Sequence, residues 1–210
     1  DLLVDPERFY HQRSSSANPE SLSSNLVWTF LQDRSGLFWV GTANGGLNKL
    51  NPQVQRFQLY RNDPNDPKSL SYDSVGPIVE GRQGRIWLGT LGGGLESFDR
   101  QTRTFTHYVQ PPGEALSQQA NTYASLLEDR RGALWLGTLA GLGRLDPNTG
   151  NIDTYRHSPD DPESLVNDNV LSMVEDQSGR LWVGTASGID VVKLQLSDTP
   201  REARFQHLQI

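Results

Sequence analysis

The sequence contains no cysteine and a single methionine among its 210 residues. A chain without cysteine needs no redox management, so it tolerates an oxidising compartment. No apolar run approaches the roughly 18 residues of a membrane span, and no segment has the pattern of a secretory signal. The net charge is −6 and no basic patch is concentrated in the chain, which argues against a nucleic-acid partner.

What the sequence has is repetition. The stretch "GLFWVGTANGGL" begins at Gly36, and close copies begin at Gly84, Gly132 and Gly179. The repeated tryptophans are spaced 48, 48 and 47 residues apart, and a Gly-Thr pair follows each. These tryptophans and glycines are Trp39 and Gly41, Trp87 and Gly89, Trp135 and Gly137, and Trp182 and Gly184. A period in this range predicts a repeat architecture.

Each repeat has the pattern of four short strands separated by turn residues. In the second repeat we expect strands at 74–80, 85–90, 95–99 and 104–109. Four such strands every 48 residues predict an all-β fold, a β-propeller built of four-stranded antiparallel blades. Full blades are expected at residues 21–61, 69–109, 118–156 and 165–208, and residues 1–13 resemble the end of a preceding blade.

The chain thus holds about four and a half repeats, and we expect it to be an excised part of a larger ring. The remaining propeller blades would lie elsewhere in the parent chain or come from a second copy. Stacked blades protect their faces only when the ring closes or caps are present.

The repeated residues have a structural interpretation. Tryptophan can fill the wedge between neighbouring blades, with its N–H finding a partner. Glycine suits close approach of the backbone. Three repeats also carry D-x-x-G before the tryptophan, as in Asp33 to Gly36, which is turn chemistry, whereas the second repeat has Gly81 in place of the aspartate.

The unit "NPESLSSNLVWTFLQDRSGLFWVGTANGGLNKL" resembles the two-component regulator propeller repeat. Its opening returns as "PKSLSYDSV" and "PESLVNDNV", while the third repeat departs with "EALSQQANTY". The resemblance implies a periplasmic sensor region of a bacterial hybrid histidine kinase or diguanylate cyclase, whose parent protein is anchored in the inner membrane. It also implies that the ligand of some members is an oligosaccharide.

Candidate ligand-binding residues lie at the starts of the first strands. Asn25, Asp73, Asn121 and Asp168 occupy one repeat position. They would form a polar ring near the axis, or they would cap the preceding turns. The long loops 61–73 and 156–168 place further Asp residues on the same face, where they would form turns or bind calcium, although the pattern of a calcium loop is missing.

Three aromatic residues complete the candidate site. Trp28 stands where the other repeats have Gly76, Ala124 and Leu171. With Tyr72 and Tyr123 near equivalent positions, Trp28 could stack on a sugar ring, or it could fill the core.

No Ser-His-Asp grouping, HExxH motif or phosphate loop is present. His11, His107 and His207 fall at one repeat position on the outer strands of different blades, so we expect no metal site and no cofactor. Three functions remain open: a non-catalytic sensory propeller that binds a small molecule or oligosaccharide, a protein-interaction or dimerisation platform, and a polysaccharide-cleaving enzyme.

Overall fold

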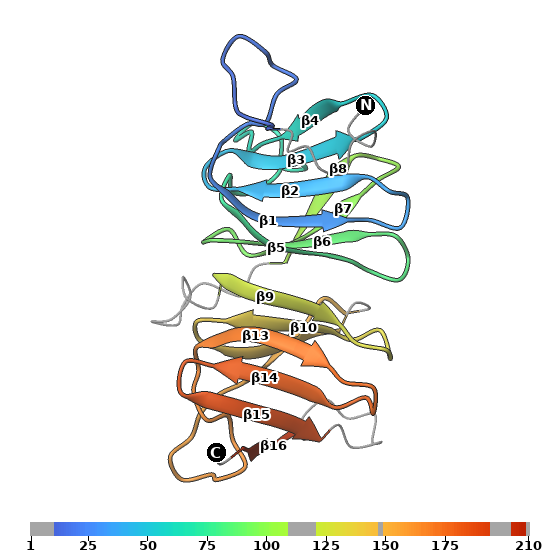
Figure 1. Ribbon diagram of the computed structural model, residues 1–210. Helices are drawn as coiled ribbons and strands as arrows, with labels where there is room; N and C mark the ends of the chain where they lie inside the picture. Colours follow the sequence, from blue (N-terminus) through green and yellow to red (C-terminus); the bar gives the residue numbers. More distant parts are fainter. Residues whose placement is uncertain (1–10, 109–120, 147–148, 194–202, 209–210) are drawn as a thin grey trace. The chain divides into compact units, whose positions relative to one another are not determined.

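The computed structural model describes residues 11–108, 121–146, 149–193 and 203–208. Within these residues the protein is all-β, with four antiparallel sheets of four strands each, and every sheet is a meander in chain order. Figure 1 shows the sheets from blue to red. We number them blades 1 to 4. The described part of the chain forms no helix that could cross a membrane.

The strands of blades 1 and 2 are short and follow the expected repeat. Blade 1 consists of β1 (Val27–Gln32), β2 (Phe38–Thr42), β3 (Gly46–Asn51) and β4 (Arg56–Tyr60). Blade 2 consists of β5 (Val75–Glu80), β6 (Ile86–Thr90), β7 (Leu95–Asp99) and β8 (Thr104–Tyr108).

Blades 3 and 4 repeat the arrangement. Blade 3 consists of β9 (Tyr123–Glu128), β10 (Leu134–Thr138), β11 (Gly141–Leu145) and β12 (Ile152–Tyr155). Blade 4 consists of β13 (Val170–Glu175), β14 (Leu181–Thr185), β15 (Gly188–Lys193) and β16 (Arg204–His207). The four-stranded antiparallel blades confirm a partial β-propeller, while the expected end of a preceding blade at residues 1–13 lies mostly outside the described residues.

The chain divides into two compact units. One comprises Asp1–Thr90 and Glu96–Thr106, and the other comprises Leu91–Leu95 and His107–Ile210. Blades 1 and 2 pack together in the first unit, and blades 3 and 4 pack together in the second. We call these two contacts junction 1–2 and junction 3–4.

Both junctions are built from the same repeat positions. In junction 1–2, Trp39 and Leu47 of blade 1 are fully buried against Val75 and Ile86 of blade 2. Junction 3–4 has the equivalent residues Trp135, Leu142, Val170 and Leu181 in its core. The prediction that tryptophan fills the wedge between blades is therefore confirmed at both junctions.

In blades 1 and 3 the face that carries the tryptophan packs on the following blade, and we call the tryptophan-bearing face of every blade its trailing face. The opposite face, which in blades 2 and 4 packs against the blade before it, is called the leading face. Side chains of successive residues in a strand point to opposite faces. On β1, Leu31 accordingly packs into junction 1–2, while Phe30 is 72% exposed on the leading face of blade 1.

The repeated glycines make the close approach of blades possible. A Cβ atom built on Gly41 would lie 2.8 Å from the backbone oxygen of Val75 in the next blade. At Gly137 it would lie 2.9 Å from Cγ1 of Val170, again in the next blade. Gly184 meets only Ser172 of its own blade. The prediction of close approach is thus confirmed for Gly41 and Gly137.

The D-x-x-G turn and the tryptophan form one hydrogen-bonded unit. Asp33 Oδ1 accepts the backbone N–H groups of Ser35 (2.9 Å) and Leu37 (3.0 Å), and its Oδ2 accepts the indole N–H of Trp39 at 2.6 Å. Asp129 and Asp176 accept their indole N–H groups at 2.8 and 2.9 Å. The sequence predicted both parts but not that one carboxylate joins them. In blade 2, Gly81 supplies no carboxylate.

These hydrogen bonds control the protonation of the aspartates. Burial raises the pKa of the Asp33 carboxyl, but hydrogen bonds from Ser35, Trp39 and Leu37 outweigh it, so the pKa lies below its ordinary value. The hydrogen bond from Trp182, together with backbone donors, lowers the pKa of Asp176 well below its usual range. Both turns therefore hold an ionised carboxylate at neutral pH.

Candidate ligand-binding surface

The loops that precede blades 1, 2 and 4 are capped in the same way. Asn25 Oδ1 accepts the backbone N–H of Ser14 at 2.8 Å. Asp73 accepts that of Asn62 at 2.8 Å, and Asp168 accepts that of His157 at 2.6 Å. Each acceptor closes a loop that began eleven residues earlier. The structure therefore shows capping by these three candidate residues, and their role toward a ligand stays a prediction.

The acidic residues inside the loops form turns. Asp63 Oδ1 accepts the backbone N–H of Asn65 and Asp66 Oδ1 accepts that of Lys68, both at 2.9 Å. Asp161 makes the equivalent bond to Glu163 at 3.0 Å. Among the described residues, no group of three His, Asp or Glu side chains is placed to hold a metal ion. The same short-range bonds in two loops favour the turn interpretation.

Buried polar side chains of the third strands fasten the loops from within the blades. Asn48 accepts the backbone N–H of Ser23 at 3.0 Å. Asp190 accepts that of Val166 at 2.9 Å, and both acceptors are fully buried. Glu96 at the same repeat position of β7 accepts the N–H of Ser71 at 3.0 Å. Sequence reasoning missed this position, although its signal is present as the polar residue in G-L-N, G-L-E and G-I-D.

His207 has a specific partner in blade 4. Its Nδ1 lies 2.6 Å from Oδ1 of Asp190, while the other carboxylate oxygen of Asp190 binds the loop. The imidazole is one-third exposed and the carboxylate is buried. This histidine therefore supports the loop before blade 4 through Asp190.

A bulge in the first strand exposes one side chain in blades 1 and 4, namely Trp28 and Leu171. The register shifts between Val27 and Thr29 in β1 and between Val170 and Ser172 in β13. Bulges re-aim side chains, and Trp28 is 46% exposed at this point. Within the described residues Trp28 therefore does not fill the core, so its ring is available to a ligand.

Tyr72 is the second accessible aromatic side chain, and it is also 46% exposed. It lies in the loop before blade 2, beside Asp73, whose carboxylate caps that loop. The hydrogen bonds of Asn62 to the carbonyl oxygens of Leu70 and Ser71 hold the backbone on the N-terminal side of this ring. Tyr72 is thus an exposed ring on an ordered loop.

Two candidate residues of blade 3 are covered. Tyr123 is fully buried, and burial raises the pKa of its phenol. Its repeat equivalents Val75 and Val170 are also fully buried, so this is a packing position. This corrects the expectation that the Tyr123 ring is open to a ligand. Asn121 is 7% exposed, and its backbone oxygen accepts the N–H of Gly92 at 3.3 Å.

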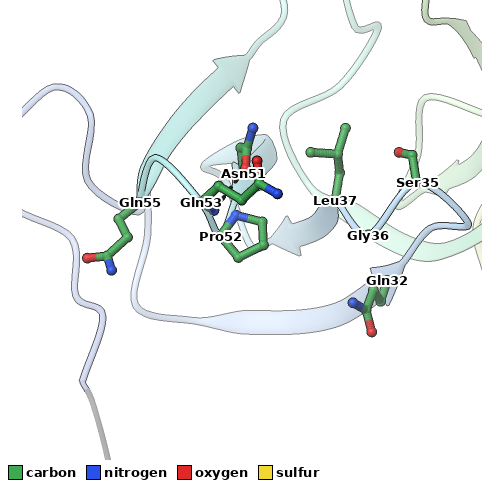
Figure 2. Close-up of a pocket in the computed structure, with 8 residues that line it drawn as sticks. All are labelled: Gln32, Ser35, Gly36, Leu37, Asn51, Pro52, Gln53 and Gln55. Carbon is green, nitrogen blue, oxygen red and sulfur yellow. Dashed lines mark hydrogen bonds between the residues drawn. The ribbon is translucent and has the colours of Figure 1, made fainter. Parts of the chain in front are cut away.

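A pocket of about 810 Å³ lies at the opposite end of blade 1 from the loops. Figure 2 shows its walls, which are the end of β1, the β1–β2 turn and the β3–β4 turn. The side chains are mostly neutral amides and small groups, namely Gln32, Ser35, Gly36, Leu37, Asn51, Pro52, Gln53 and Gln55. Sequence reasoning did not single out any of them.

A smaller pocket lies at the equivalent turns of blade 2. Its volume is about 300 Å³, and it is lined by Gln83, Gly84, Arg85, Asp99, Arg100 and Gln101. Arg100 of this pocket reaches Asp33 of blade 1 at 3.2 Å. The pocket is therefore small where a preceding blade is packed and large at blade 1.

Comparison with known proteins agrees with the fold. The model of the family described as two component regulator propeller matches residues 21–44, 117–140 and 164–187. These segments contain the turn and tryptophan of three of the four repeats, and they confirm the resemblance to this family. The chain matches no curated protein.

Several solved structures share the fold at low identity. The extracellular domain assigned to the hybrid two component system BT3049 from B. thetaiotaomicron has a TM-score of 0.74 and 24% identity over 93% of this chain. The corresponding domain of BT4673 from the same organism has a TM-score of 0.69 and 24% identity over 83%. This chain spans only 26% and 22% of those two chains.

An enzyme is also among the similar structures. Virginiamycin B lyase from Staphylococcus aureus has a TM-score of 0.61 and 16% identity over 88% of this chain, which spans 55% of the lyase. At these identities the solved structures show the fold, and function has to be argued from the site.

Proposed function

We propose that this chain is part of the extracytoplasmic sensor region of a bacterial two-component receptor and that it binds its ligand without catalysis. The observation that carries the proposal is the family match at three repeats. The similarity to extracellular domains of two-component systems supports the same class and a periplasmic location. The receptor would be anchored in the inner membrane, and no nucleic acid or cofactor would be involved.

The loop-bearing end of blades 1 and 2 is the binding surface that we propose. Trp28 and Tyr72 offer exposed rings, and Asn25 and Asp73 hold the adjoining loops in place. An exposed ring beside fixed polar groups suits a sugar, because the aromatic ring packs on the apolar face of the sugar while amide and carboxylate oxygens accept hydrogen bonds from its hydroxyl groups. The ligand class that we propose is therefore an oligosaccharide.

The charged side chains of this surface support binding rather than turnover. The carboxylate of Asp73 closes its loop by accepting the backbone N–H of Asn62 through Oδ1. Glycoside hydrolysis uses a pair of carboxyl groups that flank the scissile bond, and the residues that we place at this surface supply only this one. The lyase alternative therefore depends on fold similarity alone.

Calorimetric titration with a panel of defined oligosaccharides tests the proposal. The panel contains xylan, mannan, cellulose and chondroitin fragments. We expect at least one member to bind, and Trp28→Ala to weaken that binding by at least about tenfold, because the indole supplies the apolar surface on which the sugar ring packs and burial of an aromatic side chain contributes roughly 1.5–3 kcal/mol. Leu171→Ala, at the equivalent bulge of blade 4, is the matched control and should leave the affinity unchanged.

Two results would contradict the proposal. If no member of the panel gives a heat of binding, the proposed ligand class, an oligosaccharide, is wrong. If chromatography detects cleavage products of a panel member, the chain is an enzyme and the proposal of a non-catalytic sensor is wrong.

A protein-interaction platform is the second candidate function. The observation in its favour is the exposure of two apolar side chains, Phe30 of blade 1 and Val174 of blade 4. Both lie on first strands rather than in the loops, so both functions can belong to one chain.

A further inference from the structure

The turn between β2 and β3 of blade 1 is hydrogen-bonded to both segments that carry an exposed aromatic ring. The backbone N–H of Ala43 donates to the carbonyl oxygen of Leu26 at 3.0 Å, two residues before Trp28. The backbone N–H of Gly46 donates at 2.8 Å to the carbonyl oxygen of the residue that follows Tyr72. One turn therefore fixes the backbone beside both rings, although one ring belongs to blade 1 and the other to the loop before blade 2.

The exposure of these two positions does not depend on an uncovered blade face. Leu171 stands in blade 4 where blade 1 has Trp28, and the leading face of blade 4 packs against blade 3. Leu171 is nevertheless 49% exposed. Tyr72 precedes blade 2, whose leading face packs against blade 1. Both positions therefore stay open to solvent where a preceding blade is present.

Asn44 lies in the middle of this turn and holds an amide group at the surface. Its φ of 55° is left-handed, a conformation that asparagine adopts more readily than most residues. Ser74 Oγ accepts the backbone N–H of Asn44 at 3.2 Å and donates to its Oδ1 at 2.7 Å. Asn44 is exposed, and within the described ranges of the chain its Nδ2 group donates no hydrogen bond. The side chain is therefore fixed through its oxygen, and both N–H groups of the amide remain available to a ligand.

The guanidinium of Arg61 lies beside the same turn. Its Nε–H donates to the carbonyl oxygen of Gly45 at 3.4 Å. Arg61 is exposed, and among the residues that the structure describes it forms no ion pair and its Nη groups donate no hydrogen bond. Asp63 and Asp73 of the same loop accept backbone N–H groups instead. A guanidinium and an amide donor on one turn suit a carboxylate, because hydrogen bonds between charged groups are roughly twice as strong as neutral ones.

Junction 3–4 has the arginine but not the amide. Arg156 is the equivalent of Arg61, and its Cγ lies 3.2 Å from a Cβ atom built on Gly141 of the neighbouring turn. That turn, between β10 and β11, is one residue shorter than the turn of blade 1. It carries two apolar residues, Leu139 and Ala140. Of the two junctions that the structure describes, only junction 1–2 therefore combines the two kinds of donor.

We propose that Asn44 and Arg61 form a subsite for a carboxylate group of the ligand, so that the chain binds acidic rather than neutral oligosaccharides. This inference rests on the proposed function, because it adds a specificity-determining subsite to the same surface. Trp28 and Tyr72 pack on sugar rings, while the amide of Asn44 and the Nη groups of Arg61 donate to the carboxylate of a uronic acid. A neutral sugar offers the guanidinium no opposite charge, so it binds more weakly.

Calorimetry with acidic oligosaccharides and their methyl esters tests the subsite. Fragments of galacturonan, glucuronoxylan and unsulfated chondroitin are titrated as free acids and as methyl esters, which keep the sugar rings and lose the charge. Neutral xylan, mannan and cellulose fragments complete the series. We expect the tightest ligand to be a free acid, and its methyl ester to bind at least about tenfold more weakly. Equal affinity of acid and ester, or a neutral fragment as the tightest ligand, would overturn the subsite and leave the proposed function standing. If no fragment binds, both are wrong.

Substitutions assign the effect to the two residues. Arg61→Gln removes the charge, and Asn44→Asp keeps the acceptor for Ser74 but removes the amide donors. Each should weaken binding of the free acid by at least about tenfold and change binding of the methyl ester much less. Arg103→Gln is the matched control, because Arg103 is an exposed arginine at the opposite end of blade 2 and Gln55 has the same left-handed conformation at the equivalent position of blade 1.

Urea midpoints show whether each variant remains folded, and Arg61→Gln alters only an exposed side chain. We expect the control to bind the free acid as the unmodified chain does. An equal loss of affinity for acid and ester in Arg61→Gln, or an equal loss in Arg103→Gln, would contradict the subsite.

Discussion

Junction 1–2 and junction 3–4 are built from the same repeat positions, but the side chains at those positions differ in volume. Junction 1–2 contains Trp39, Tyr60, Phe98 and Phe105, with Phe98 at 5.4 Å from the Trp39 ring and 4.8 Å from the Tyr60 ring, measured between centroids. Junction 3–4 has Val192 where junction 1–2 has Phe98. The same repeat positions therefore face the neighbouring blade in both junctions, whereas the size of the side chains at those positions varies.

A second difference lies between the D-x-x-G turns of blades 1 and 4. In junction 1–2, Arg100 of blade 2 forms ion pairs with Asp33 at 3.2 Å and with Glu80 at 2.8 Å. In blade 4, Asp176 is paired with Arg180 of its own blade at 2.7 Å. The equivalent turn aspartates thus have a partner in the next blade in one case and in their own blade in the other.

Among the substitutions that compare a closed junction with an uncovered blade face, Trp39→Ala should have the largest effect on stability. Removing a fully buried tryptophan leaves a cavity, and we expect the free energy of unfolding of its unit to fall by about 3–5 kcal/mol. Trp182→Ala is the matched control, and because that ring is only partly buried, its loss should be smaller. Urea unfolding followed by circular dichroism measures both, and equal losses would mean that the junction contributes nothing specific.

Gly41→Ala should have an intermediate effect. The added Cβ meets the backbone oxygen of Val75 in the next blade at 2.8 Å, and backbone cannot move aside without opening the junction. We expect destabilisation by about 1–3 kcal/mol. A Cβ atom at Gly184 meets a serine hydroxyl of its own blade, which can rotate. The urea midpoint of Gly184→Ala should therefore shift less than that of Gly41→Ala. A larger shift for Gly184→Ala would contradict the role of Gly41 in the close approach of the blades.

Lowering the pH should have the smallest effect on stability, and it should act through the carboxylates of the D-x-x-G turns. The pKa of Asp33 is lower in the folded protein than in the unfolded chain. The stability that Asp33 contributes is therefore fully present above the unfolded value of about 4, and it is lost as pH falls from there through the folded pKa. Urea midpoints between pH 7 and pH 3 measure this loss. Asp33→Asn should make the midpoint less dependent on pH below 4, and an unchanged pH dependence would contradict the role of this carboxylate.

The sequence predicted the blades because the same local signals occur four times. Strand-length apolar runs and the W-x-G-T strand recur in all four repeats and the D-x-x-G turn in three, all at one period, and the structure has a four-stranded sheet at each repeat. Periodicity also predicted that Trp39 and Gly41 belong to the contact between blades.

The candidate site was harder to predict because exposure depends on neighbours. Tyr123 and Tyr72 are both tyrosines near the start of a first strand, yet one is buried and the other is half-exposed. Their repeat positions differ by three residues, and only the sheet register shows that Tyr123 stands at the position of the buried residues Val75 and Val170. The buried Asp190 was missed for a related reason, since its bond to Val166 joins residues far apart in the sequence.

The contact between the Trp39 and Phe98 rings tests the repeated junction most directly, because the two residues belong to different blades. Nuclear Overhauser spectroscopy of the chain should show cross-peaks between the two rings, whose centroids lie 5.4 Å apart. Cross-peaks from Trp39 only to residues of its own blade would contradict the packing of trailing face on leading face.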